Sequence, residues 1–169
     1  EGWIYADSLI EDKREIKRSI LNGDYESVVG KIIVSKDDVV YIPSGTLHAL
    51  TRGSLVYEIQ QSTDITYRFF DYNRLDNDGK LRDLHLDDAI ETLNTENRVK
   101  SSAFPKDTLV SEQPYTMVRK TLENVYHNTT DVAVAITVSK GSMCVDGHSI
   151  LAGMSILVLP DEAISISQA

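Results

Sequence analysis

One of the four histidines in the sequence stands where a turn opens onto a predicted strand. His48 follows the turn from Pro43 to Thr46 and lies within the short stretch Leu47–Leu50. A neutral imidazole at such a position can offer a lone pair to a metal ion, and a hydrogen bond to the loop backbone is the alternative. The other three lie at the start of a predicted helix or in polar turns, which favours structural or solvated roles: His85, His127 and His148. The spacing of the four histidines gives no complete metal site.

A second group of chemically useful side chains lies between residues 58 and 68. If residues 54–60 and 65–70 are strands, Glu58 lies on a face of the first, and Asp64 and Arg68 share a face of the second. Pairing as a hairpin would bring carboxylates to a guanidinium, which suits proton transfer beside a stabilising cation. A ladder of surface salt bridges is the alternative. Nearby cations that could meet a phosphate, or simply water, are Arg74, Lys80 and Arg82.

Several common catalytic signatures are absent from the sequence. No Gly-x-Ser-x-Gly nucleophile elbow is present, although Ser44 lies near His48. The glycine-rich phosphate loops of dinucleotide-binding and P-loop proteins are missing as well. The sequence therefore argues against a serine hydrolase and against a nucleotide-binding enzyme of these types.

The composition restricts the partners and the compartment. The 169 residues include 17 Lys and Arg against 26 Asp and Glu, a net charge of −9. Such a balance argues against nucleic acid and against an anionic membrane as partners, but leaves room for a small phosphorylated ligand. The single cysteine, Cys144, excludes an intrachain disulfide and a thiolate zinc cage. We therefore expect a cytoplasmic protein, and no apolar run is long enough for a membrane helix.

Hydrophobic periodicity predicts a mainly β protein with few helices. A capping box at Ser8 and Glu11 leads into a helix over 13–21, and Asp24 is expected to cap a second short helix. A further helix is expected over 86–93. The expected strands lie at 1–6, 32–34, 39–42, 54–60, 65–70, 116–122, 132–138, 143–145, 149–151 and 155–159.

Short strands joined by tight glycine turns indicate a β-barrel or sandwich. Two similar β-units are expected, over 1–98 and 99–169, with the polar stretch 94–114 at the boundary. The chain begins with Glu1 in what reads as a strand, without an initiator Met, so we expect it to be part of a longer protein.

Three ordered sequence blocks resemble a known family. Residues 41–50, 58–74 and 79–86 are similar to the class I mannose-6-phosphate isomerases, in their short bacterial form. The resemblance covers nearly the whole chain as the C-terminal part of such an enzyme, is specific over 41–86, and is general to cupin-like domains after residue 110. It implies a cupin-type β-barrel or jelly roll with peripheral helices. On this basis 1–98 is a partial catalytic domain with a helical excursion, and 99–169 is a smaller cupin-like domain.

The resemblance also implies an activity and a set of site residues. The family comprises zinc-dependent aldose–ketose isomerases that interconvert mannose 6-phosphate and fructose 6-phosphate through a cis-enediolate. The zinc ligands fall on His48 and Glu1, and the catalytic arginine falls on Arg68. Proton transfer falls on Glu58 or Asp64, and which of the two moves the proton is left open. Residues implied in substrate binding are Ser44, Thr46 and Arg68.

Two departures from the family pattern keep a second interpretation open. The family's Gln-x-His ligand pair has no counterpart in this sequence, and Asp37-Asp38 stands where a Gly-Asp turn is usual. The activity of this chain by itself is therefore left open. The alternative is a non-catalytic cupin-type protein that binds a sugar or has a regulatory role.

Overall fold

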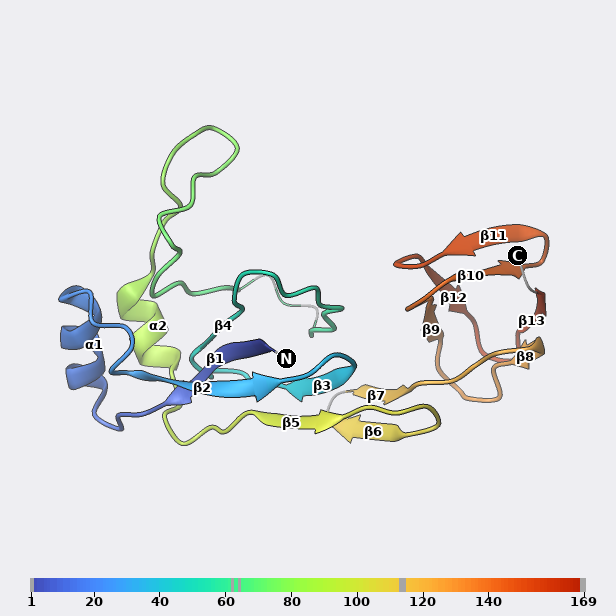
Figure 1. Cartoon of the computed structure of the whole chain (residues 1–169), viewed down its shortest axis with the longest axis horizontal. Coiled ribbons are helices and arrows are strands. Elements are labelled where there is room, and N and C mark those ends of the chain that lie inside the picture. The colour runs from blue at the N-terminus through green and yellow to red at the C-terminus, as the bar shows by residue number, and fades with distance from the viewer. Residues whose placement is uncertain (1, 62, 64, 113–114, 168–169) are drawn as a thin grey trace. The chain divides into compact units, whose positions relative to one another are not determined.

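The chain folds into two compact units, Glu1–Met117 and Val118–Ala169. The structure is a computed structural model, which describes residues 2–61, 63, 65–112 and 115–167 (Figure 1). It is mainly β, as predicted, and two helices lie in the described part of the first unit. The contacts place residues 99–117 with the first unit, whereas the sequence predicted a boundary after residue 98. No helix in the described ranges has the length and apolarity needed to cross a bilayer.

The first unit is built on a three-stranded antiparallel sheet with β1 in its centre. Strand β1 (Gly2–Ser8) pairs with β2 (Val29–Val34) on one side and with β4 (His48–Ala49) on the other. In this register Ala6 lies directly opposite His48. Since directly opposed residues project to the same side of a sheet, the His48 side chain leaves the sheet on the face of the buried Ala6.

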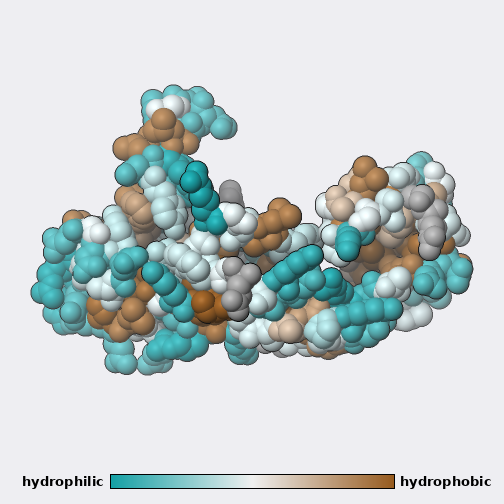
Figure 2. Space-filling model, viewed as in Figure 1, coloured by the Kyte–Doolittle hydropathy of each residue, from teal (hydrophilic) through white to brown (hydrophobic). Residues whose placement is uncertain are grey.

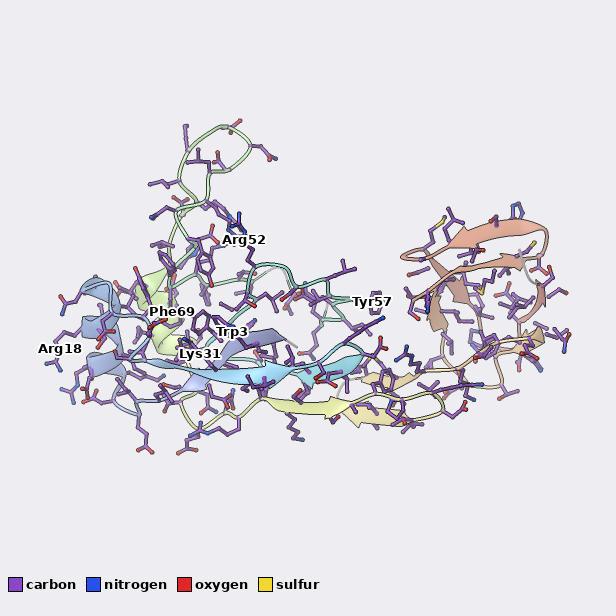
Figure 3. All side chains as sticks on the ribbon, viewed as in Figure 1. Trp3, Arg18, Lys31, Arg52, Tyr57 and Phe69 are labelled. Atoms are coloured by element: carbon purple, nitrogen blue, oxygen red, sulfur yellow. The ribbon has the colours of Figure 1, made fainter. Side chains whose placement is uncertain are left out.

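The other face of this sheet carries two aromatic rings beside a cation. Trp3 and Tyr5 alternate with the buried Ile4, and the two rings meet edge to face at 4.7 Å. The ammonium group of Lys31 lies 4.9 Å from the centre of the Trp3 ring (Figure 3). Such a cation–π contact shields the aromatic surface of β1 while it keeps the charge in water.

Pairing with β3 joins the start of residues 99–117 to the first unit. Strand β3 (Asp38–Tyr41) pairs with β5 (Lys100–Ala103), and β6 (Leu109–Glu112) pairs with β7 (Tyr115–Val118). The polar stretch 94–114, predicted as a boundary, thus contains strands. Strand β5 is short and exposed throughout, so it lacks the apolar alternation that sequence analysis detects.

Helix α1 (Lys13–Leu21) has the bounds that the sequence predicted. Its N-cap is Asp12, whose carboxylate accepts a hydrogen bond from the backbone N–H of Arg14 at 2.8 Å. The predicted capping box at Ser8 and Glu11 is wrong, because Ser8 ends β1 and its hydroxyl donates to the carbonyl of Ile10. The predicted short helix after Asp24 is also wrong.

Helix α2 (Leu86–Thr92) packs with α1 in the core of the first unit. That core contains Ile16, Ile20, Val28 and Leu93. The partly buried Leu86 and Phe69 contact it, and Phe69 is labelled in Figure 3. Ile16 and Ile20 are one helical turn apart, which places both on the face of α1 that looks toward α2. The burial of this face holds α2 in place.

The predicted strands over 54–60 and 65–70 are not formed. Residues 54–60 lie outside the sheets and are exposed throughout, with Leu55 99% exposed. An alternating sequence becomes a strand only where another strand's backbone is available to pair with it. No strand pairs with this segment in the described part of the chain.

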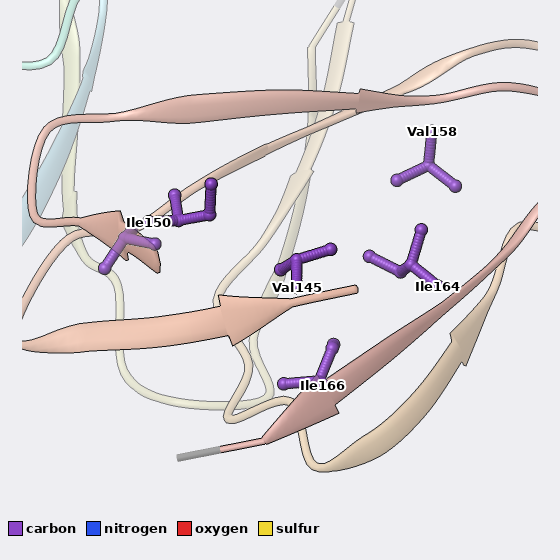
Figure 4. Packing of buried hydrophobic residues seen from close by; sticks show 6 residues of the cluster. Val145, Ile150, Val158, Ile164 and Ile166 are labelled. Atoms are coloured by element: carbon purple, nitrogen blue, oxygen red, sulfur yellow. The ribbon is translucent and has the colours of Figure 1, made fainter. Parts of the chain in front are cut away.

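The second unit has its own core. Its strands form a four-stranded sheet in the order β11-β10-β13-β8 and a two-stranded sheet of β12 and β9. Their bounds are β8 Asn124–His127, β9 Val134–Thr137, β10 Ser142–Val145, β11 His148–Leu151, β12 Ser155–Val158 and β13 Ala163–Ser167. Inward-facing residues from these strands, including Val145, Val158 and Ile164, pack together (Figure 4). Other hydrophobic residues of both units lie at the surface (Figure 2).

A buried amide group holds the second unit together, and its exchange for a carboxylate tests this role. Asn128 is fully buried, and its Nδ2 donates to the carbonyls of Val132, Val158 and Leu159 at 2.8–3.1 Å. Asn128→Asp would place a carboxylate against three carbonyl oxygens. We expect the second unit to lose about 3 kcal/mol of stability, measured by hydrogen exchange of the β13 amides. The matched change Asn124→Asp, at an exposed position, should have little effect. Equal effects of the two changes would contradict this role.

Candidate functional site

The candidate site is built on the loop between β3 and β4, and Gly45 fixes the conformation of this loop. Gly45 has φ +78°, a region that only glycine enters without strain. A Cβ atom at this position would lie 2.8 Å from the carbonyl oxygen of Thr92, at the end of α2. The carbonyl of Gly45 accepts a hydrogen bond from the backbone N–H of Asn94 at 2.8 Å. The loop therefore packs closely against the C-terminal end of α2.

Thr46 organises the inside of the same loop. It is buried, and its hydroxyl donates to the carbonyl of Pro43 at 2.6 Å. The Nδ2 of Asn97 donates to this hydroxyl oxygen at 3.0 Å and to the carbonyl of Ser44 at 2.8 Å. The hydroxyl of Thr46 is thus engaged within the protein. The predicted substrate contacts of Thr46 and Ser44 stay predictions.

His48 is held in one tautomer by this loop. Its Nδ1 lies 2.9 Å from the carbonyl oxygen of Thr46. A carbonyl only accepts hydrogen bonds, so the neutral ring carries its proton on Nδ1 and its lone pair on Nε2. The side chain is exposed. A histidine whose Nδ1–H is bound to a backbone carbonyl has the arrangement typical of a metal ligand that binds through Nε2.

A bulge in β1 fixes the other side of the loop. Asp7 has φ +68° and interrupts the register with β2. Its backbone N–H donates to the carbonyl of Leu47 at 3.1 Å, and its carboxylate accepts from the N–H of Val99 at 2.8 Å. Asp7 therefore joins the residue before His48 to the chain that follows α2.

Arg68 lies in a segment that is tied to the other end of α2. Its carbonyl accepts a hydrogen bond from the backbone N–H of His85, the residue that precedes the helix, at 3.0 Å. The side chain is half-buried, and its guanidinium has no hydrogen bond or ion pair with the residues that the structure describes. Its neighbour Phe69 packs into the core beside α2. An anchored backbone, with a guanidinium that has no partner among these described residues, is suited to binding an anion.

Helix α2 thus connects the two candidate segments. The loop of His48 is bound at its C-terminal end through Asn94, and the segment of Arg68 is bound at its N-terminal end through His85. Seven helical residues span about 10 Å. The helix sets the spacing between the two attachment points.

The basic residues of the following turn pair with a buried carboxylate. Asp71 is buried and binds Arg74, and its Oδ2 lies 3.3 Å from Nε of Arg82. A cavity of about 60 Å³ lies beside this group. The two arginines, predicted to meet either phosphate or water, are therefore held together by Asp71, with one positive charge in excess.

The described residues supply one candidate zinc ligand. His48 fits zinc by its tautomer and exposure. No group of three or more His, Cys, Asp or Glu side chains suitable for a metal lies within residues 2–61, 63, 65–112 and 115–167. Glu1, the second predicted ligand, and Asp64, a predicted proton-transfer residue, lie outside the described residues. The zinc site stays a prediction.

The predicted convergence of Glu58 with Arg68 on a hairpin is not observed, because neither segment forms a strand. Glu58 is exposed.

Sequence analysis did not identify two residues of the site, Asp7 and Asn97. A hydrogen bond from a side chain to a distant carbonyl leaves no periodic signal, although an Asp inside a strand pattern is a weak indication of a bulge.

The chain is similar to known proteins over part of their lengths. No family model matches it. The probable mannose-6-phosphate isomerase GmuF of Bacillus subtilis (strain 168) is 46% identical over 81 residues, which are 48% of this chain and 26% of that protein. The mannose-6-phosphate isomerase of Streptococcus mutans is 41% identical over 83 residues, or 49% and 26% of the two chains.

A solved structure extends the similarity to almost the whole chain. The crystal structure of the mannose 6-phosphate isomerase from Bacillus subtilis superposes with a TM-score of 0.66 and 27% identity. It covers 99% of this chain, which spans 58% of the length of that protein. The mainly β, cupin-type fold that the sequence predicted is confirmed, and so is the resemblance to this family.

The contact of Gly45 with α2 can be tested against a glycine that lacks such a contact. Gly45→Ala and Gly53→Ala both place a side chain at positive φ. This backbone conformation alone should lower the free energy of unfolding by about 1 kcal/mol in each variant. Only at Gly45 does the new Cβ meet backbone, whereas nothing lies within 4 Å at Gly53. We expect Gly45→Ala to be the more destabilising change in urea unfolding and to shift the amide resonance of Asn94. Equal stabilities with an unchanged Asn94 resonance would contradict this packing.

Proposed function

We propose that this chain, which is homologous to the mannose-6-phosphate isomerases, carries part of the catalytic machinery of such an enzyme. The reaction would interconvert mannose 6-phosphate and fructose 6-phosphate with zinc as cofactor. The observation that carries the proposal is the hydrogen bond from His48 Nδ1 to the carbonyl of Thr46, because it leaves Nε2 exposed as a metal donor. The homology extends to about a quarter of the curated relatives' length, so the activity of the whole protein is part of the proposal.

In this proposal His48 is a zinc ligand and Glu1 is a second. Zinc, when bound, would supply Lewis-acid polarisation of sugar oxygens. The loop contributes preorganisation, because Thr46 orients the imidazole before any metal arrives. Little side-chain entropy would then be lost on binding.

Arg68 would stabilise the charge that develops during proton transfer. Isomerisation of the open-chain aldose removes the proton on C2 and moves its electron pair into a C1–C2 enediolate. The hydroxyl proton then passes from O2 to O1, and a proton returns to C1. The guanidinium stays protonated at any working pH, so it can bind the enediolate oxygen throughout. Its lack of an ion pair within the described residues supports this role. Glu58 or Asp64 would accept the proton from C2 and deliver it to C1.

A binding function without catalysis is the alternative. The described residues hold one candidate metal ligand, and a cupin-type scaffold can keep a sugar site without the reaction. Binding of mannose 6-phosphate without turnover, in the presence of zinc, would favour this alternative.

The proposal is tested by zinc analysis together with an isomerisation assay on Arg68 variants. Arg68→Ala should lower kcat by about 10²–10³-fold and leave zinc content unchanged, since it removes a charge that acts on the transition state. The control Arg18→Ala removes an exposed arginine of α1 whose ion pair with Glu15 is weak, and it should keep full activity (Figure 3).

Two results would count against this assignment. Retained turnover in Arg68→Ala would reject the catalytic role of Arg68. A chain that binds neither zinc nor mannose 6-phosphate would reject the proposed function as a whole.

A further inference from the structure

Asn97 uses both of its amide hydrogens on the loop that precedes His48. It lies five residues after the end of α2 and is half-buried. Its Nδ2 donates to the carbonyl of Ser44 at 2.8 Å and to the hydroxyl oxygen of Thr46 at 3.0 Å. A carboxamide NH₂ group has two hydrogens, so the donor capacity of Asn97 is fully used here.

This contact fixes the orientation of the Thr46 hydroxyl. The oxygen accepts from Asn97, and its own hydrogen is directed to the carbonyl of Pro43 at 2.6 Å. Both the side chain and the turn of Thr46 are therefore held in place. The carbonyl of the same residue is the group that meets Nδ1 of His48 at 2.9 Å. Thr46 thus links Asn97 to the imidazole, with its hydroxyl bound to Asn97 and its carbonyl bound to His48.

The chain on either side of Asn97 is anchored independently. The backbone N–H of Asn94 binds the carbonyl of Gly45, and the N–H of Val99 binds the carboxylate of Asp7. With both flanks fixed, the Asn97 side chain cannot move away from the loop as a free surface group would. The neighbouring Asn94 side chain does not share this task, because its oxygen accepts from the N–H of Glu96 instead.

We infer that Asn97 is a positioning residue for His48: it holds the Thr46 carbonyl so that the imidazole keeps its proton on Nδ1 and presents Nε2 to a divalent cation. The cation part of this inference rests on the proposed function. The tautomer part does not, because it follows from the hydrogen bonds alone. Asn97 itself touches neither metal nor substrate.

The test compares Asn97→Ala with Asn94→Ala. The second change removes the same carboxamide from the same turn and keeps the backbone hydrogen bond of residue 94 to the loop. The first readout is the pair of ¹⁵N chemical shifts of the His48 ring in the metal-free chain at about pH 8. We expect the unaltered chain and Asn94→Ala to show the Nδ1–H tautomer, and Asn97→Ala to show a mixture. A role in overall stability would not move this signature.

The second readout is zinc affinity, which we expect to fall about tenfold in Asn97→Ala and to stay unchanged in Asn94→Ala. Asn97→Asp is the second variant, because it keeps the shape of the side chain and removes both donors; it should lose the tautomer preference at least as strongly. Amide spectra that match the unaltered chain establish that each variant is folded.

The tautomer measurements decide whether Asn97 positions His48. An unchanged tautomer in folded Asn97→Ala and Asn97→Asp, or the same mixture in Asn94→Ala, would overturn it. A chain that shows the expected tautomers but binds no zinc would leave the positioning role intact and remove the proposed metal function, so the two failures are distinguishable.

Discussion

The first unit depends on the anchoring of two chain segments to the two ends of one short helix. At one end of α2 the Gly45 loop is bound through Asn94, and at the other end Arg68 is bound through the backbone of His85. The helix itself is fixed because Leu93 is buried against the apolar face of α1. Hydrophobic burial thus holds a helix whose flanking residues, His85 and Asn94, bind the two candidate segments through their backbone N–H groups.

The site contains backbone geometry that an isolated loop would avoid. Asp7 adopts a left-handed conformation that costs about 1–2 kcal/mol for a residue other than glycine. Hydrogen bonds to Leu47 and Val99 offset this cost, and Leu47 directly precedes His48 in the chain. Strained positions are often found where a protein orients functional groups. The second unit has a self-contained core and none of the predicted site residues.

The sequence predicted the locally determined features well. The bounds of α1, the β class and the glycine turns of the second unit follow from periodicity and positive φ at glycine, which act over a few residues. The strands at 54–60 and 65–70 were predicted wrongly because strand formation needs a partner elsewhere in the chain. Strand β5 was missed because its residues, Lys100–Ala103, carry no apolar alternation and pair with the distant β3.

In the candidate site, too, the locally determined residues could be predicted from the sequence and those that depend on distant contacts could not. His48 could be selected from its turn and Arg68 from its resemblance to the family, since both depend on sequence blocks. The contribution of Asn97 could not, because it contacts residues 51 and 53 positions earlier in the chain. Contacts over such separations are fixed by the packing of α2, and a single sequence gives no record of them.

The central claim is that the loop presents Nε2 of His48 as a metal donor. Anomalous diffraction at the zinc edge, on crystals of the zinc-loaded protein, measures this directly. The account predicts a zinc peak about 2.0–2.1 Å from Nε2 of His48, with Nδ1 still bound to the carbonyl of Thr46. Zinc bound through Nδ1, or a peak remote from His48, would contradict it.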